Sequence, residues 1–305
     1  MEIWQLKQLQ ALPLEVKILK AQQRITEWYE HWNGQVYISF SGGKDSTVLL
    51  HLVRELYPEV PAVFVDTGLE YPEIKEFVKT FDNITLIRPD KSFKEVLDTE
   101  GYPVAGKEIA RAVKYAQKGS KWALNKMKGL DKEGKPNKFK ASYKKWGLLV
   151  TAPFKVSDSC CDVMKKKPFK QYEKKTGNYP IIGTMACESV LRQTQWLKTG
   201  CSSFNSARKK SSPMSFWVEQ DILEYLHSKN LPIASVYGDI VFEKGVYKTT
   251  GVKRTGCMFC MFGVHLEKGE NRFQRMKRTH PKIYDYCINN LKCGEVLDYI
   301  GVSYT

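Results

Sequence analysis

The residues from Val36 to Leu52, VYISFSGGKDSTVLLHL, restrict the fold more than any other part of the chain. A short β-branched and aromatic run is followed by two glycines and then by apolar residues at helical spacing. The pattern predicts a buried strand that leads through a glycine turn into a helix. Such a turn is a natural anion site, because unpaired backbone N–H groups and the positive end of the helix dipole converge there.

The side chains of this turn fit an anion with several oxygens. Gly42 and Gly43 allow the backbone to approach an oxyanion, and Lys44 adds a mobile positive charge. Asp45 either caps the helix or meets a Mg²⁺ carried by phosphates. The spacing is not that of a Walker A loop, which has another glycine five residues before Gly-Lys. The candidate binding residues are Ser39, Ser41, Gly42, Gly43, Lys44, Asp45 and Ser46.

Strands and helices alternate along much of the chain. This alternation predicts an α/β fold with a parallel sheet covered by helices on both faces. A leading amphipathic helix is expected over residues 13–32. Further strands are expected at AVFVD (62–66), ITLIRP (84–89), LLVTA (148–152) and YPIIGT (179–184), and further helices at 71–81, 161–175, 189–197 and 218–228.

The length of 305 residues allows one large domain or a domain with an appendage. We expect an N-terminal helix in residues 1–33, a nucleotide-binding α/β domain in 34–265 with a lysine-rich insertion at about 107–146, and a helical extension in 266–305. No apolar run is long enough for a membrane span, and the N-terminus has no apolar signal core. These features predict a cytoplasmic protein without a membrane partner.

Positive charge is concentrated in one segment. The chain carries a formal charge of +15, and residues 107–146 alone hold twelve lysines and one arginine against three acidic residues, a net charge of +10. The segment is either a solvated, lysine-coated helical insertion or a surface for a nucleic-acid backbone. The second interpretation is favoured by aromatic residues between the lysines, which offer stacking faces: Tyr115, Trp122, Phe139, Tyr143 and Trp146.

The stretch SFSGGKDS (39–46) resembles the PP-loop of the ATP pyrophosphatases. The resemblance implies an adenine nucleotide alpha hydrolase-like, Rossmann-type fold that binds ATP with Mg²⁺, releases pyrophosphate and forms an adenylate, with Lys44 and Asp45 as catalytic residues. VDTGLEYPE (65–73) resembles the sulfate-assimilation branch that contains the PAPS reductases. By this similarity Asp66, Thr67 and Gly68 lie beside the nucleotide.

GTMACESVLR (183–192) is similar to a glycine–arginine–glutamate element of the same branch. The resemblance implies that Gly183 and Glu188 contact the nucleotide and that Arg192 acts on the substrate. Ala186 and its neighbours do not supply the first arginine of this element. A later segment, 213–238, is similar to the branch through Trp217, Asp221 and Tyr237.

Four of the eight cysteines form two close pairs, Cys160–Cys161 and Cys257–Cys260. Adjacent cysteines are poor joint ligands for one small ion because their side chains diverge, whereas a cuboidal cluster offers each thiolate its own iron. The pattern therefore favours a 4Fe–4S cluster, with a zinc site or plain buried thiols as alternatives. It also resembles the cluster-binding set of the APS reductases.

Cys293, in LKCGEVLDYIGVSYT, echoes the Glu-Cys-Gly of that family, whose thiolate attacks sulfonyl sulfur. Lysine replaces the glutamate here and no histidine follows. The residue is a candidate catalytic thiol, or else a small core residue.

Because the chain keeps the whole Ser-Gly-Gly-Lys-Asp-Ser sequence, we expect it to bind ATP. The favoured hypothesis is an ATP-activating enzyme that transfers sulfur, with an iron–sulfur cluster, to a nucleic acid or a small acceptor. One alternative is an APS or PAPS reductase that forms sulfite from adenylyl sulfate, and another is a non-catalytic nucleotide-binding module. Candidate partners are a sulfur donor or thioredoxin-like reductant, and a second copy of the chain in a homodimer.

Overall fold

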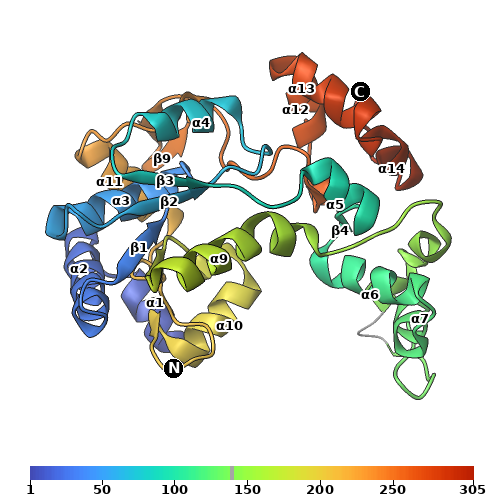
Figure 1. Ribbon diagram of the computed structural model, residues 1–305, viewed down its shortest axis with the longest axis horizontal. Helices are drawn as coiled ribbons and strands as arrows, with labels where there is room; N and C mark the ends of the chain where they lie inside the picture. Colours follow the sequence, from blue (N-terminus) through green and yellow to red (C-terminus); the bar gives the residue numbers. More distant parts are fainter. Residues whose placement is uncertain (138–140) are drawn as a thin grey trace. The chain divides into compact units, whose positions relative to one another are not determined.

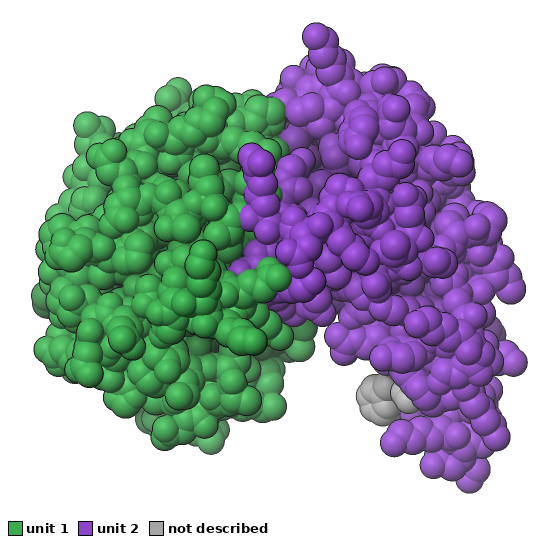
Figure 2. Space-filling view, viewed as in Figure 1, with its two compact units in different colours: residues 1–66, 70–87, 169–255 green, residues 67–69, 88–168, 256–305 purple. Residues whose placement is uncertain are grey.

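A computed structural model describes residues 1–137 and 141–305. By its internal contacts the chain divides into two compact units, coloured separately in Figure 2. Unit 1 comprises residues 1–66, 70–87 and 169–255, and unit 2 comprises residues 67–69, 88–168 and 256–305.

Unit 1 is built on a six-stranded sheet in the order β3-β2-β1-β5-β7-β6, of which Figure 1 labels β1, β2 and β3. All neighbouring strands run parallel except β6, which is antiparallel to β7 at the edge. The sheet confirms the predicted α/β class. Its strands are β1 (Val36–Ser39), β2 (Ala62–Val65), β3 (Ile84–Ile87), β5 (Tyr179–Ile182), β6 (Ser202–Ser203) and β7 (Lys210–Ser211), and a separate hairpin consists of β8 (Ile240–Glu243) and β9 (Val246–Thr249).

The helices of unit 1 follow the predicted pattern, with one short addition at the N-terminus. They are α1 (Ile3–Gln10), α2 (Leu14–His31), α3 (Lys44–Leu56), α4 (Pro72–Lys79), α9 (Lys167–Thr176, whose first two residues belong to unit 2), α10 (Val190–Thr199) and α11 (Glu219–Ser228).

Both faces of strand β1 are covered. The Tyr37 ring packs against Phe169 and Tyr172 of α9, and its hydroxyl donates a hydrogen bond to Glu173 at 2.8 Å. Val36 and Ile38 point to the opposite face, since side chains alternate along a strand, and both are fully buried. This burial on both faces explains why the first three residues of the strand are apolar or aromatic.

Unit 2 is mainly helical. A short parallel pair joins β4 (Val104–Ala105) to β10 (Met261–Phe262), so the segment before the basic insertion lies beside the segment after the Cys-x-x-Cys motif. The helices are α5 (Phe93–Thr99), α6 (Lys107–Gln117), α7 (Lys121–Met127), α8 (Ala141–Lys144), α12 (Arg272–Thr279), α13 (Pro281–Asp285) and α14 (Cys293–Tyr299). Two π-helical turns, Asp162–Lys166 and Tyr286–Asn290, precede α9 and α14.

The strand predicted at LLVTA is wrong. Residues Gly147–Thr151 form a 3₁₀ helix, in which Leu149 is completely buried. A short apolar run of this kind is equally typical of a buried strand and of a buried helical turn, so periodicity could not separate them.

Within the described ranges, no helix combines the length and the apolar composition that crossing a bilayer requires.

Candidate nucleotide and cysteine sites

The glycine turn after β1 has a backbone that other residues could not adopt easily. Gly42 has a φ of +68°, and a Cβ at this position would lie 2.8 Å from methyl groups of Ile74 and Val78 on α4. A side chain would therefore strain the backbone and collide with α4. Gly42 lets the loop lie directly on this helix.

Hydroxyl groups organise the interior of the loop. The Ser46 Oγ donates to the carbonyl of Gly43 at 2.8 Å and accepts the N–H of Ser41 at 3.2 Å. The Ser41 and Ser46 hydroxyl oxygens lie 3.0 Å apart. Both hydroxyls thus lie at the N-terminus of α3, where the helix dipole favours an anion.

The hydroxyl of Tyr237 lies over the same backbone. It accepts the N–H of Lys44 at 3.3 Å and is 2.7 Å from the Thr255 hydroxyl. Burial raises the pKa of Tyr237. A neutral phenol therefore occupies a backbone N–H that an anion could otherwise use.

Lys44 is held within unit 1 and is only 3% exposed. Its ammonium nitrogen lies 3.2 Å from the Lys253 carbonyl oxygen, 3.2 Å from a Glu219 carboxylate oxygen and 3.5 Å from Asp45 Oδ1. Within the described residues, Asp45 Oδ1 is buried and has no hydrogen-bond donor. The loop therefore carries a confined cation beside an incompletely coordinated carboxylate oxygen.

The ends of β2 and β5 hold the other predicted nucleotide residues. At the end of β2, Asp66 forms a 2.6 Å ion pair with Lys75 of α4. At the end of β5, a Cβ on Gly183 would lie 3.2 Å from the Asp45 carbonyl, so this strand end touches the loop. Thr67 and Gly68 belong to unit 2, where the Thr67 hydroxyl accepts the Leu69 N–H at 3.2 Å.

Glu188, which follows β5 in the chain, forms ion pairs with two arginines. Its carboxylate pairs with Arg192 one helical turn later and with Arg254 at 3.4 Å, and it accepts the Met185 N–H at 2.8 Å. Sequence reasoning found Glu188 and Arg192 but missed Arg254. Arg254 supplies a second guanidinium beside the Glu188 carboxylate.

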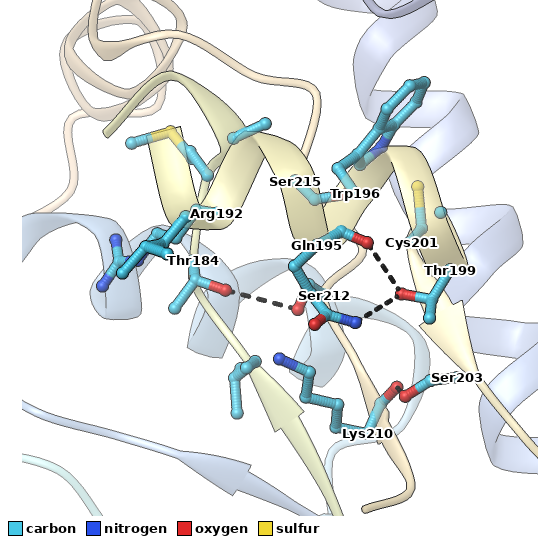
Figure 3. Close-up of a pocket in the computed structure, with 15 residues that line it drawn as sticks. Thr184, Arg192, Gln195, Trp196, Thr199, Cys201, Ser203, Lys210, Ser212 and Ser215 are labelled. Atoms are coloured by element: carbon cyan, nitrogen blue, oxygen red, sulfur yellow. Dashed lines mark hydrogen bonds between the residues drawn. The ribbon is translucent and has the colours of Figure 1, made fainter. Parts of the chain in front are cut away.

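A cavity of about 260 Å³ lies between the end of β5, helix α10 and the β6–β7 edge (Figure 3). The Lys210 amine and the hydroxyls of Thr184 and Ser212 point into the same space (Figure 3). Burial, together with the charges of Arg208 and Arg192, lowers the pKa of Lys210. Ser215 also lines the cavity, and its buried Oγ has no partner among the described residues.

Among the described residues that line this cavity, two are cationic and none is acidic. The space therefore suits an anionic group. Lys210 and Ser215 were not predicted, because they lie in the stretch RKKSSPMS (208–215), which has no readable apolar period.

The two cysteine pairs lie in unit 2 as two local structures. Cys160 and Cys161 begin a helix, and Cys257 and Cys260 flank a tight turn closed by the Cys260 N–H to the Cys257 carbonyl at 3.1 Å. A hydrogen bond between the adjacent thiols lowers the pKa of Cys161 to about 6 and raises that of Cys160. Cys257 and Cys260 are close enough to raise the pKa of Cys160 further.

Positive charge surrounds this cysteine group. Lys107, Lys165 and Lys166 also lower the pKa of Cys161, and Arg272 donates to the Cys260 carbonyl at 2.9 Å. No three histidine, cysteine or carboxylate side chains of the described chain converge tightly enough to hold a single metal ion. The pairs are therefore neighbours without forming a mononuclear site.

Cys293 is not exposed, as the thiol of a nucleophile would be. It is completely buried at the start of α14 and lies beside the equally buried Cys287, whose pKa is raised mainly by a hydrogen bond between the two thiols. Access to its sulfur would require the C-terminal helices to move.

The basic segment exposes fewer aromatic rings than its sequence offers. Tyr143 and Trp146 are 9% and 5% exposed, so the prediction that they provide stacking faces is wrong. Tyr115 and Trp122 remain on the surface, and Phe139 lies outside the described residues.

The sequence matches the family model described as the phosphoadenosine phosphosulfate reductase domain, over residues 35–128 and 107–261. An uncharacterized protein of Methanocaldococcus jannaschii is 24% identical over 286 residues, which cover 92% of this chain and 53% of the relative, so the chain spans about half of that protein's length. A phosphoadenosine 5'-phosphosulfate reductase of Xanthomonas axonopodis pv. citri is 23% identical over 250 residues, covering 79% of this chain and 82% of the relative. Among solved structures, the PAPS reductase of Candida auris in a phosphate complex matches with a TM-score of 0.42 at 13% identity, over 77% of this chain and 90% of that one.

Proposed function

The chain belongs to the phosphoadenosine phosphosulfate reductase family, and from this premise we propose that it is an ATP pyrophosphatase that forms an adenylated intermediate for sulfur transfer. The observation that carries the proposal is the complete Ser-Gly-Gly-Lys-Asp-Ser loop with its confined lysine. A reductase acting on an adenylyl sulfate has no pyrophosphate leaving group, and it has no need of a binding site for one.

In this proposal the loop binds the β- and γ-phosphates of ATP. The Ser41 hydroxyl and the backbone N–H groups at the start of α3 donate to the phosphate oxygens, while the Ser46 hydroxyl keeps its hydrogen bond to the Gly43 carbonyl. Lys44 moves from its ion pair with Glu219 to the phosphates, and the phosphates displace the Tyr237 hydroxyl from the Lys44 N–H. Asp45 Oδ1, which has no hydrogen-bond donor among the described residues and lies 3.5 Å from the Lys44 ammonium, fits a Mg²⁺ carried by the nucleotide once Lys44 has moved to the phosphates.

The chemistry is a displacement at the α-phosphorus. An acceptor oxygen forms a bond to that phosphorus while the bond to the bridging oxygen breaks, and pyrophosphate leaves with its electron pair. A sulfur nucleophile then replaces the adenylated oxygen, and AMP leaves. Arg192, Lys210 and the hydroxyls of the neighbouring cavity are suited to hold the anionic acceptor near the end of β5.

The four cysteines support a 4Fe–4S cluster as the resident cofactor. Cys160 and Cys161 lie at the start of a helix, and Cys257 and Cys260 flank a turn, so these four thiolates would be the ligands of the four irons. When bound, such a cluster would supply bridging sulfide and one-electron redox chemistry, and free thiols favour a reducing compartment such as the cytoplasm.

We further propose a nucleic acid as the acceptor, because the basic segment offers a surface for polyanions. A sulfur donor would renew the transferred sulfur, a thioredoxin-like reductant would supply electrons, and a homodimer is compatible with this scheme.

A second candidate is an APS or PAPS reductase. It is favoured by the reductase relatives and by Cys293, the candidate thiol. It is weakened by the complete burial of Cys293 beside Cys287.

The test is anaerobic incubation of the purified protein with ATP, adenylyl sulfate or phosphoadenylyl sulfate, followed by identification of every product. AMP and pyrophosphate from ATP support the proposal. Sulfite from either sulfated nucleotide, with ATP untouched, supports the reductase instead.

A further inference from the structure

Two helices of unit 2 present an aromatic pair to solvent. Tyr115 on α6 and Trp122 on α7 are 44% and 45% exposed. Their ring centroids lie 5.6 Å apart with a tilt of 50° between the planes. Large aromatic side chains contribute most when they are buried, so an exposed pair marks a surface that a partner covers.

Unneutralised lysines surround this pair. Lys118 and Lys121 flank the turn between the two helices, and Lys128 follows α7. All three are exposed, and among the described residues no acidic side chain lies within ion-pair distance of them. By contrast, Arg111 and Lys114 of α6 are paired with Asp158 and Glu100 at 2.8 and 3.0 Å.

We propose that these five residues, Tyr115, Lys118, Lys121, Trp122 and Lys128, form an aromatic–lysine surface that binds an unpaired strand of nucleic acid. Unpaired bases can stack on the two rings while the lysines contact the phosphates of the same strand. A duplex keeps its bases stacked on one another and would offer the surface only its phosphates. The inference deepens the proposed function by naming a single strand as the acceptor, although binding itself needs no ATP.

Helix α6 connects this surface to the cysteine group within unit 2. Arg111 and Lys114 of this helix contact Asp158 and Ser159, which directly precede Cys160, at 2.8 and 2.7 Å, and Tyr115 lies eight residues after the first helical residue, Lys107. At 1.5 Å per residue the separation along α6 is about 12 Å. This length corresponds to roughly three to four stacked nucleotides. A strand held on the surface can therefore extend to the cysteines.

The test uses the full-length protein without ATP, and a fluorescein-labelled single strand of about 16 nucleotides, as DNA and as RNA, beside the matching duplex. Fluorescence anisotropy gives the affinity between about 50 and 200 mM salt. We expect the single strand to bind more tightly than the duplex. Trp122→Ala should weaken single-strand binding by roughly 5- to 150-fold, the effect of one lost stacking contact.

The lysines have a separate readout. The logarithm of the affinity falls linearly with the logarithm of the salt concentration, and each phosphate contact to a single strand contributes about 0.7 to this slope. Replacing both Lys118 and Lys121 by Gln should therefore make the slope shallower by about 1.4. The matched controls are Trp4→Ala, which changes a 54% exposed tryptophan on α1, and Lys174→Gln with Lys175→Gln on α9. Neither control should change affinity or slope. Circular dichroism verifies that every variant is folded.

Two results would overturn the inference. One is equal binding of duplex and single strand that does not respond to Trp122→Ala. The other is binding of polyglutamate or of phosphatidylserine vesicles with the same dependence on Tyr115 and Trp122, which would assign the surface to an acidic protein or a membrane. Strand binding without AMP formation from ATP would contradict the proposed function and leave this inference intact.

Discussion

At the scale of single residues, the proposed binding of ATP depends most on Lys44. The lysine is buried rather than extended into solvent, and its ammonium lies 5.9 Å from the centroid of the Tyr237 ring as well as beside Glu219. It therefore packs as well as carrying charge. A buried cation with a half-exposed carboxylate partner can exchange that partner for phosphate at little cost, because Glu219 returns to water.

We predict that Lys44→Met, which keeps most of the side-chain volume, lowers ATP affinity by roughly 10- to 150-fold. This is the range for loss of a hydrogen bond to a charged group. Isothermal titration calorimetry measures the affinity and thermal melting measures the fold. Lys79→Met, on the exposed face of α4, is the control and should bind ATP normally. Unchanged affinity in Lys44→Met would remove the nucleotide assignment of this loop.

At the scale of elements, helices α2 and α11 are joined by a buried ion pair. Lys17 contacts both carboxylate oxygens of Asp221 at 2.8 Å, and Asp221 also accepts the Val218 N–H at the start of α11. The sequence predicted both helices from their periodicity. It could not predict the pair, because 204 residues separate two side chains that are usually found on surfaces.

We predict that Lys17→Met lowers the free energy of unfolding by about 3–5 kcal/mol, since it leaves a buried carboxylate without its counter-ion. Adding Asp221→Asn should recover part of this loss, because the amide is neutral and its oxygen still accepts the Val218 N–H. Urea denaturation measures both values. A double variant less stable than Lys17→Met would show that the charge is not the cause.

A second element-scale prediction concerns Tyr143 beside α6. Its hydroxyl donates to Glu108 at 2.9 Å, and burial together with this hydrogen bond raises the pKa of Tyr143 to about 12. In the unfolded chain the phenol ionises near pH 10. Its contribution to the stability of the fold is therefore complete below pH 10 and is lost as the pH rises from 10 to 12.

Between pH 10 and pH 12 the free energy of unfolding of Tyr143→Phe should therefore fall less than that of the parent protein, by on the order of 1–2 kcal/mol. Urea denaturation at both ends of the window measures the difference. Tyr115→Phe, on the exposed surface of α6, is the control and should follow the parent. The same loss of unfolding free energy between pH 10 and pH 12 in Tyr143→Phe and in the parent would contradict the burial of this phenol.

At the scale of the whole molecule, the periodicity of apolar residues was sufficient to predict strands β1, β2, β3 and β5 and the helices between them. It was insufficient for β6 and β7, because strands of two residues have no readable period. Motifs located the glycine loop, but the cavity beside it depends on Lys210 and Ser215, which only the folded chain brings together. The approach of Cys257 and Cys260 to Cys160 is likewise a property of the fold, since 95 residues separate the two pairs.

We predict that protein purified without oxygen is brown and that Cys257→Ser loses the broad visible absorbance. Iron and acid-labile sulfide analysis measures the cluster directly. Cys201→Ser is the control, since this cysteine lies in unit 1 and should not affect the colour. Zinc, or no metal at all, in anaerobic protein with its four cysteines intact would contradict the cluster.

The central claim is that this chain breaks ATP between its α- and β-phosphates. Anaerobic protein is incubated with Mg²⁺ and ATP labelled in the γ-phosphate, with and without single-stranded nucleic acid, and the labelled product is separated. We expect labelled pyrophosphate together with AMP, at a rate that Lys44→Met abolishes. Labelled orthophosphate with ADP, or intact ATP under every condition, would contradict it.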